Sequence, residues 1–293
     1  MLQIGVDGLR VISIIAITLI YMLFDLFNKR AIPNQIVYAS VLYALFIALV
    51  YFDSTTIANL GIAAVVLLAG YIVYRIGQIG AADVAEFIAI SLLMPLQEVS
   101  LGLGASVQMP FILSVLIDAG MAALVMFPLY YIPKGYRRIK DPLATVSKRD
   151  FSKAVAIGLI YAFFVAFLVI ELDIDMLRFL LLALVMISSI SIVLFERLMT
   201  QAMVEYVPVA RFESGDMIAL NLMDASAVRS IKGKVKSFER LANDRMISEM
   251  KRKRIRTLFP VYKEGMPFAV AIFVGTVLAI TLGNLLIFIL APA

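Results

Sequence analysis

Two aspartates, Asp25 and Asp83, are the residues whose type and placement point most directly to chemistry. Each stands where an apolar stretch meets a short polar break, in FDLFNKRAIPN (24–34) and in GQIGAADVAEF (77–87). A carboxylate near a membrane interior is costly unless it is paired, solvated or functional. Two carboxyl groups a few ångströms apart share a proton, because like charges resist joint ionisation. Such a pair can hydrolyse a peptide bond, one member activating water while the other protonates the carbonyl or the leaving amine.

The composition leaves few other kinds of catalysis open. The chain contains no cysteine and no histidine, which excludes disulfides, thiolate nucleophiles, Cys/His zinc sites and Ser-His or Cys-His arrangements. Acid–base work therefore falls to Asp, Glu, Lys or Tyr. We expect neither a metal nor a cofactor.

The elements that must position the two aspartates are membrane helices. Apolar residues make up 62% of the 293 residues, charged residues make up 16%, and the mean hydropathy is +0.98. An ordinary soluble domain is only about 45–50% apolar, so we expect an all-α polytopic membrane protein. A crossing needs about 17–25 apolar residues. This criterion predicts eight transmembrane helices, approximately at 9–28, 35–52, 56–75, 82–97, 110–132, 154–171, 176–195 and 266–290.

The distribution of Lys and Arg predicts the orientation. With the amino terminus outside, all 26 basic residues except Arg10 and Arg178 fall on the cytoplasmic side. This asymmetry is typical of membrane topology and not of a nucleic-acid-binding surface, so we expect no nucleic-acid partner. Asp25 then ends the first span and Asp83 opens the fourth. Both carboxylates are therefore expected at the cytoplasmic face of the cell membrane.

Short breaks in the helices flank both aspartates. Pro33 disfavours helix at the preceding residues and separates the first two spans. Gly77 and Gly80 precede Asp83, and their small size lets another backbone approach closely. They are expected either to form an active-site loop against which a substrate strand lies, or simply to make a tight turn between two spans.

In these features the chain resembles the archaeal prepilin and preflagellin peptidases, which are GxGD-type membrane aspartyl proteases of the type IV prepilin peptidase family. The resemblance rests on Asp25 followed by Lys29-Arg30 and Ile32-Pro33-Asn34, and on Gly80-Ala81-Ala82-Asp83 at the start of a later span. It implies that Asp25 and Asp83 are catalytic. It also implies that the partners are pilin-like or archaellin precursors, whose leader peptides are removed at the cytoplasmic membrane face.

The sequence departs from the family pattern at two positions beside Asp83. Ala82 replaces the second glycine of the motif, and Ala85 stands where the family often has a lysine. The four-cysteine zinc loop of bacterial relatives is absent from the sequence. The resemblance therefore implies the peptidase activity alone, without the methyl-transferring activity of those relatives.

The resemblance covers residues 1–133, the expected peptidase core. Residues 134–293 are expected to form an accessory region, with cytoplasmic loops at 134–153 and 197–265 and three further spans. The sequence of the second loop predicts a small α+β insertion before the last span. In it, YVPVARFESGDMIALNL (206–222) predicts a hairpin around Ser214-Gly215-Asp216. Apolar residues then recur at helical spacing in a basic segment, at Val228, Ile231, Val235, Phe238 and Leu241.

The basic segment has two interpretations of comparable weight. In the first interpretation, the segment forms a basic amphipathic helix that lies on the anionic inner leaflet. In the other, the helix packs against the hairpin and exposes its charges to water.

Two further acids and three other functions stay open. Glu86 is expected to point to water, with support of the aspartate pair as the alternative. Asp118 is expected to be neutral or hydrogen-bonded between helices, with a third functional acid as the alternative. An ion- or proton-coupled transporter would use Asp25, Asp83 and Asp118 as a path. A presenilin-type protease would need a Tyr-Asp pair at the first site and a Pro-Ala-Leu motif near the end, and the sequence has neither. The third alternative is a catalytically silent scaffold for pilus assembly.

Overall fold

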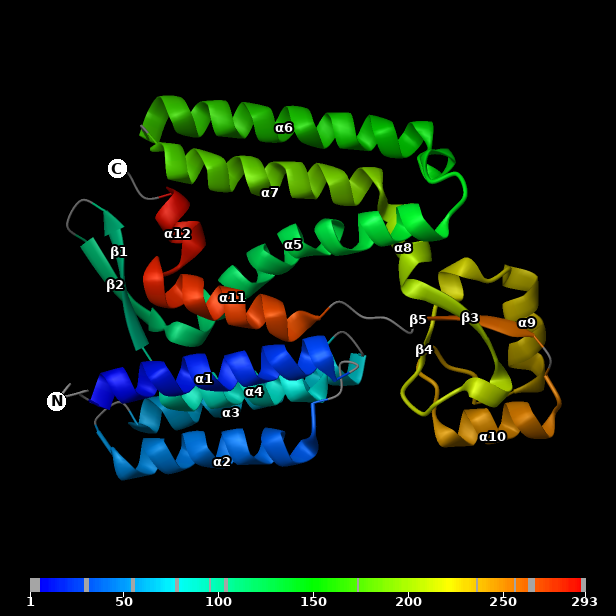
Figure 1. The fold of residues 1–293 in the computed structure, drawn as a ribbon, viewed down its shortest axis with the longest axis horizontal. Coiled ribbons are helices and arrows are strands. Elements are labelled where there is room, and N and C mark those ends of the chain that lie inside the picture. Colours follow the sequence, from blue (N-terminus) through cyan, green and yellow to red (C-terminus); the bar gives the residue numbers. More distant parts are fainter. Residues whose placement is uncertain are drawn as a thin grey trace. The chain divides into compact units, whose positions relative to one another are not determined.

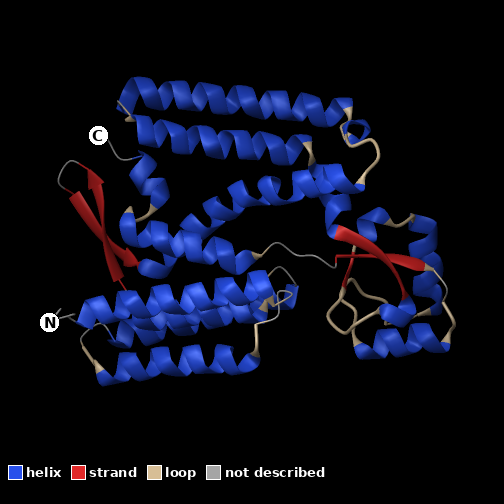
Figure 2. Ribbon diagram, in the orientation of Figure 1, coloured by secondary structure: helices blue, strands red, loops and turns tan. Residues whose placement is uncertain are grey.

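The computed structural model is mostly helical and contains two small groups of β-strands (Figures 1 and 2). The residues it describes are 6–28, 32–53, 56–76, 79–94, 96–102, 105–172, 174–235, 237–255, 257–262 and 267–290. The chain divides into two compact units. The first unit comprises Met1–Leu129, Ser147–Leu194 and Pro267–Ala293, and the second comprises Tyr130–Val146 and Phe195–Met266. The expected division at residue 133 into a peptidase core and an accessory region stays a prediction.

Within the described part of the chain, five helices are long and apolar enough to cross a membrane: α1 (Val6–Phe27), α3 (Thr56–Ile76), α5 (Phe111–Arg138), α6 (Lys148–Leu172) and α7 (Met176–Leu194). Two shorter apolar helices are α2 (Asn34–Val50) and α11 (Phe268–Thr281). Large apolar side chains point outward from the long helices, as at Phe163, which is 78% exposed. Such surfaces suit lipid rather than water. The expectation of a multi-pass, mostly helical membrane protein agrees with the structure at this level.

The fourth expected span, 82–97, is wrong in its extent. Helix α4 (Ala81–Leu93) ends after 13 residues, which is about 20 Å of helix against a hydrocarbon core of about 30 Å. Met94 is already extended, with φ −136° and ψ 101°, because a residue that precedes proline is disfavoured in the helical region. The chain continues into β1 (Leu96–Gly102), which pairs antiparallel with β2 (Ala105–Pro110).

Helix α4 lies inside the first unit. It packs against α1, α2 and α3, while α11 packs against α1 (Figure 1). Helix α3 comes close to α4 at Gly70, where an added Cβ would lie 2.5 Å from Cγ1 of Val84. Nine residues of α4 are buried: Val84, Ala85, Glu86, Phe87, Ala89, Ile90, Ser91, Leu92 and Leu93. The start of α4, which carries Asp83, is thus fixed by packing on several sides.

The second unit contains a small three-stranded antiparallel sheet. Its strands are β3 (Val204–Pro208), β4 (Met217–Ile218) and β5 (Leu258–Tyr262), in the order β3-β5-β4. The predicted hairpin around Ser214–Asp216 is wrong: β3 and β4 flank that turn, but each pairs with β5 and not with the other. The remaining helical elements are α8 (Glu196–Met203), α9 (Ala225–Lys234), α10 (Asp244–Arg252), α12 (Leu285–Leu290, in the first unit) and the 3₁₀ turns Leu143–Thr145, Val209–Arg211 and Leu220–Leu222.

The predicted basic amphipathic helix is shorter than its apolar pattern. Helix α9 ends at Lys234, so the pattern does not continue as one helix to Leu241. Ile231, Val235 and Phe238 are buried in a core that also contains residues of α10 and β5. This favours packing within the second unit over insertion of the apolar face into a bilayer. Contact between the basic residues and anionic lipid stays a prediction.

Candidate active site

Asp25 lies in the last turn of α1 and is only 8% exposed. Its Oδ2 atom accepts a hydrogen bond of 3.1 Å from the backbone N–H of Ala269, the second residue of α11. The first N–H groups of a helix have no partner within that helix. The amino end of α11 therefore supplies a fixed donor to a carboxylate that lies 244 residues earlier in the chain.

Asp83 lies in the first turn of α4 and is half-buried. Its Oδ2 atom accepts a hydrogen bond of 2.9 Å from the backbone N–H of Gly80, which precedes the helix. An added Cβ on Gly80 would lie 3.0 Å from the same oxygen. A larger residue at position 80 would thus press against the carboxylate. Gly80 contributes to the geometry of the site, whereas Gly77 lies outside the described residues, as do Lys29 and Arg30.

The structure brings Asp25 and Asp83 together. Helices α1 and α4 pack against each other, and Asp25 lies in the last turn of α1 while Asp83 lies in the first turn of α4. Each carboxyl group receives one backbone N–H, Asp25 from Ala269 and Asp83 from Gly80. The two aspartates therefore lie on helices that pack together, and both their pairing and their catalytic role stay predictions.

A third carboxyl group belongs to the same cluster. Glu86 is fully buried one turn after Asp83, so the expectation that it points to water is wrong. Its charge would interact with those of Asp83 and Asp25. Neither of its carboxyl oxygens has a hydrogen-bond partner among the described residues. Its spacing of three from Asp83 places both on one face of α4, and packing by the neighbouring helices buries that face.

Tyr21 completes the cluster from α1. Its side chain is fully buried and its hydroxyl shares a hydrogen bond of 2.7 Å with the hydroxyl of Ser40 on α2. Tyr21 lies on α1, which packs against the helix that carries Asp83 and Glu86. The spacing of four residues between Tyr21 and Asp25 is a signal that could have identified the tyrosine. No comparable signal marks Ser40 or the N–H of Ala269.

Asp118 has a different environment. It is fully buried on α5, and its Oδ1 atom accepts a hydrogen bond of 2.8 Å from the backbone N–H of Leu285, the first residue of α12. This is the expected hydrogen bond between helices. Removing a buried acceptor from such a donor costs about 1–3 kcal/mol, which gives Asp118 a structural reason to be present.

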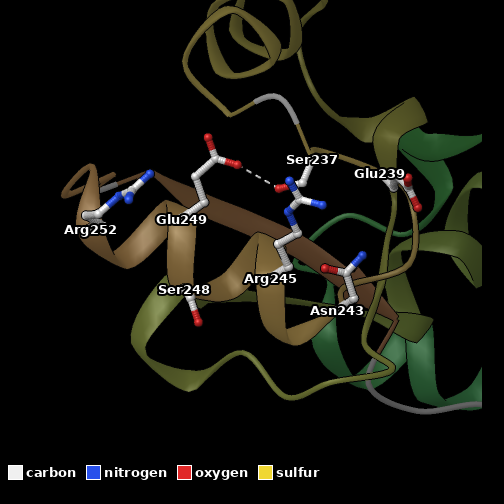
Figure 3. Close-up of a pocket in the computed structure, with 7 residues that line it drawn as sticks. All are labelled: Ser237, Glu239, Asn243, Arg245, Ser248, Glu249 and Arg252. Atoms are coloured by element: carbon white, nitrogen blue, oxygen red, sulfur yellow. Dashed lines mark hydrogen bonds between the residues drawn. The ribbon is translucent and has the colours of Figure 1, made fainter.

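The second unit contains a polar cavity of about 720 Å³ beside α10 (Figure 3). Its lining includes two arginines, Arg245 and Arg252, and two glutamates, Glu239 and Glu249. The hydroxyl of Ser237 donates a hydrogen bond of 2.7 Å to Glu249 (dashed line in Figure 3). The sequence did not indicate this cavity.

In comparisons with known proteins, no family model, no curated protein and no solved structure matches the chain. Among the described residues, no group of three or more Asp or Glu side chains is arranged to hold a metal ion. The interpretation of the site accordingly rests on the acids themselves, their neighbours and their positions at the ends of α1 and α4.

Proposed function

We propose that this protein is a membrane aspartic endopeptidase that removes leader peptides from pilin-like or archaellin precursors at the cytoplasmic face of the cell membrane. The observation that carries the proposal is the placement of Asp25 at the end of α1 and of Asp83 at the start of α4, two helices that pack against each other. The resemblance to the prepilin and preflagellin peptidases through Gly80-Ala81-Ala82-Asp83 and Ile32-Pro33-Asn34 supports the same activity.

The proposed reaction uses one proton shared between the two aspartates. One carboxylate takes a proton from water, whose oxygen attacks the carbonyl carbon of the scissile peptide bond. The other aspartic acid gives its proton to the leaving nitrogen as the C–N bond breaks. Each aspartate accepts a hydrogen bond from a backbone N–H. We treat the pair as one coupled unit.

The proposed topology has eight spans with the amino terminus outside. In it, the five long helices are joined by three shorter spans: α2, α4, and α11 together with α12. The sheet of the second unit lies in the cytoplasm. Reporters fused after Arg149 and Gly233 should therefore show a cytoplasmic location, and reporters after Asp53 and Asp175 an external one. A cytoplasmic signal after Asp175 would contradict the eight-span topology, while leaving the two aspartates on one face.

The decisive experiment measures processing of a tagged pilin-like precursor by the purified protein in proteoliposomes. Asp25→Asn and Asp83→Asn should each abolish cleavage, since Asn is nearly isosteric but cannot exchange the catalytic proton. Asp118→Asn is the matched control: its amide oxygen can still accept the N–H of Leu285, so cleavage should persist. Normal cleavage by either Asp25→Asn or Asp83→Asn in a folded protein would refute the proposal.

One observation favours a second candidate, an ion- or proton-coupled transporter. Glu86 adds a third buried carboxyl group beside Asp25 and Asp83, and buried carboxylates in membrane proteins often mark a proton path. The same proteoliposomes test this function through acidification of their interior. Proton flux that is lost with Asp83→Asn, in the absence of any precursor cleavage, would support the transporter.

A further inference from the structure

Glu86 is a buried acid that has no hydrogen-bond partner in the described part of the chain. Its side chain is fully buried on α4, and both of its carboxyl oxygens are without such a partner. Most buried side-chain polar groups in proteins are hydrogen-bonded, so an exception requires an explanation. An unpaired negative charge would cost far more in this place than a neutral polar group. Burial therefore favours the carboxylic acid form of Glu86, which has one O–H donor.

The packing of α4 does not require an acid at this position. Ala85, Phe87 and Ile90 on the same helix are buried apolar residues, and α1, α2 and α3 pack around α4. An apolar side chain of similar length at position 86 would also be buried. It would remove a polar group that has no partner, and such a group destabilises the fold. Residues that lower stability in this way are often kept for function.

Asp83 is the candidate catalytic residue within reach of Glu86. The two residues are three apart on α4, so their side chains lie on one face of the helix with Cβ atoms about 5–6 Å apart. Oδ2 of Asp83 accepts the N–H of Gly80, and Oδ1 takes no part in that bond. Hydrogen bonds between catalytic groups are often long or poorly aligned before the substrate binds, and they tighten in the substrate complex.

We propose that Glu86 is a positioning residue for the peptidase reaction and acts through Asp83. Its O–H group donates a hydrogen bond to the carboxylate of Asp83 in the substrate complex, and so holds that carboxylate in its reactive orientation. Glu86 keeps its own proton throughout, so the number of protons on the aspartate pair does not change. This inference rests on the proposed function, because the task of Glu86 is defined by the reaction at Asp83.

Two substitutions distinguish a hydrogen-bond donor from a side chain that only fills space. Glu86→Gln keeps a donor of nearly the same shape, since an amide has two N–H donors, but it cannot give or take a proton. Glu86→Met keeps the length of the side chain and removes its polar oxygens. A residue that only fills space would tolerate methionine at least as well as glutamine, whereas a donor to Asp83 would tolerate only glutamine.

Thr276 on α11 provides a matched control. It is also fully buried, and its hydroxyl oxygen has no hydrogen-bond partner among the residues that the structure describes. Thr276→Val removes this hydroxyl with little change in shape. Glu86→Met and Thr276→Val therefore each delete a buried polar group that has no partner. Only Glu86→Met deletes the proposed donor to Asp83.

The measurements are thermal unfolding in detergent and the rate of cleavage against the density of a tagged precursor in proteoliposomes. Glu86→Met should raise the midpoint of unfolding by about 2 °C or more. It should also lower the maximal rate by about tenfold to a hundredfold, with the half-saturating precursor density unchanged. Glu86→Gln should keep the maximal rate within about threefold of the unmodified protein. Thr276→Val should be at least as stable as the unmodified protein and cleave normally.

Three results would overturn the proposal. A normal rate of cleavage by Glu86→Met would show that the reaction needs no donor at this position. A loss of both stability and cleavage by Glu86→Met would assign Glu86 a structural role. Equal losses of cleavage by folded Glu86→Gln and Glu86→Met would indicate that Glu86 transfers a proton and does not merely hold Asp83 in position.

Asp83→Asn, measured in the same way, separates this inference from the proposed function. If Asp83→Asn still cleaves the precursor, the peptidase mechanism is wrong, and the role of Glu86 is refuted with it. If Asp83→Asn is inactive while Glu86→Met cleaves normally, only the role of Glu86 is refuted.

Discussion

The backbone N–H of Ala269 donates a hydrogen bond to Oδ2 of Asp25, and the two atoms are 3.1 Å apart. This contact joins the last expected span to the first. Helix α11 therefore belongs with the amino-terminal helices that hold the candidate site, although it lies within the region 134–293 that was expected to be accessory. A side chain cannot be deleted to test a backbone donor, but the donor itself can be removed with proline.

Ala269→Pro should reduce precursor cleavage by about tenfold to a hundredfold, because a hydrogen bond to a charged group contributes about 1.5–3 kcal/mol. Ala269 is the second residue of α11, and proline is tolerated in the first turn of a helix, where the N–H has no partner in the same helix. Ala269→Gly retains the donor and is the control. Cleavage and thermal unfolding are measured for both variants. Full activity of a folded Ala269→Pro protein would show that this N–H does not position Asp25.

The pH dependence of cleavage should be bell-shaped. At low pH both aspartates carry protons, so neither can accept a proton from water. At high pH both are ionised, and the leaving amine receives no proton. Activity therefore requires the singly protonated pair, and its two limbs report two apparent pKa values that belong to the pair. Initial rates across the pH range would test this. A single limb would indicate that only one of the two carboxyl groups titrates during catalysis.

Local sequence signals were sufficient to place the two aspartates. Asp25 and Asp83 stand beside polar breaks in apolar stretches, and such breaks mark helix ends whatever the rest of the fold does. The structure accordingly has α1 ending at Phe27 and α4 beginning at Ala81. The same reasoning failed a few residues later, because an apolar run that ends near Pro95 is compatible both with a long helix and with the short helix and strand that are found.

Contacts between distant segments could not be predicted. Strands β3 and β4 lie on either side of Ser214–Asp216, which satisfied the pattern for a hairpin, but their partner β5 begins more than 35 residues later. Glu86 looks like a helix residue near a polar break, and only the packing of α4 among its neighbours buries it. The donor at Ala269 is a main-chain group, which every residue except proline carries, so no residue type announces it.

Packing at Gly70 should be required for the position of Asp83. An added Cβ there would meet Cγ1 of Val84 at 2.5 Å, and the side chain of valine is stiff at its branched Cβ. Gly70→Ala should therefore lower stability by about 1–3 kcal/mol and reduce cleavage. Val84→Ala removes the opposing methyl groups, so the double variant should recover part of both losses.

Gly61→Ala is the matched control for Gly70→Ala, since an added Cβ at Gly61 meets no atom within 4 Å. The measurements are thermal unfolding in detergent and cleavage of the tagged precursor. Equal stability of Gly70→Ala and Gly61→Ala would contradict the close packing of α3 on α4. Recovery of stability without recovery of cleavage in the double variant would separate the position of Asp83 from the stability of the fold.

The basic cluster of the second unit should be dispensable for hydrolysis. Lys251, Arg252 and Arg254 are exposed, and the second unit contains neither candidate aspartate. Lys253 is different, because it forms an ion pair of 3.3 Å with Glu249 and a hydrogen bond to the carbonyl of Lys234. Replacing the first three with glutamine should leave cleavage within about twofold of the unmodified protein, since exposed charges contribute about 0–1 kcal/mol.

Replacing Lys253 as well should lower the thermal stability without abolishing cleavage, because its contacts lie within the second unit. Both variants are compared in liposomes of neutral lipid and of mixed neutral and anionic lipid. A loss of activity confined to the anionic liposomes would indicate that the basic residues contact lipid. Complete loss of cleavage by a well-folded triple variant in neutral lipid would place part of the hydrolytic machinery in the second unit, and would contradict catalysis by Asp25 and Asp83 alone.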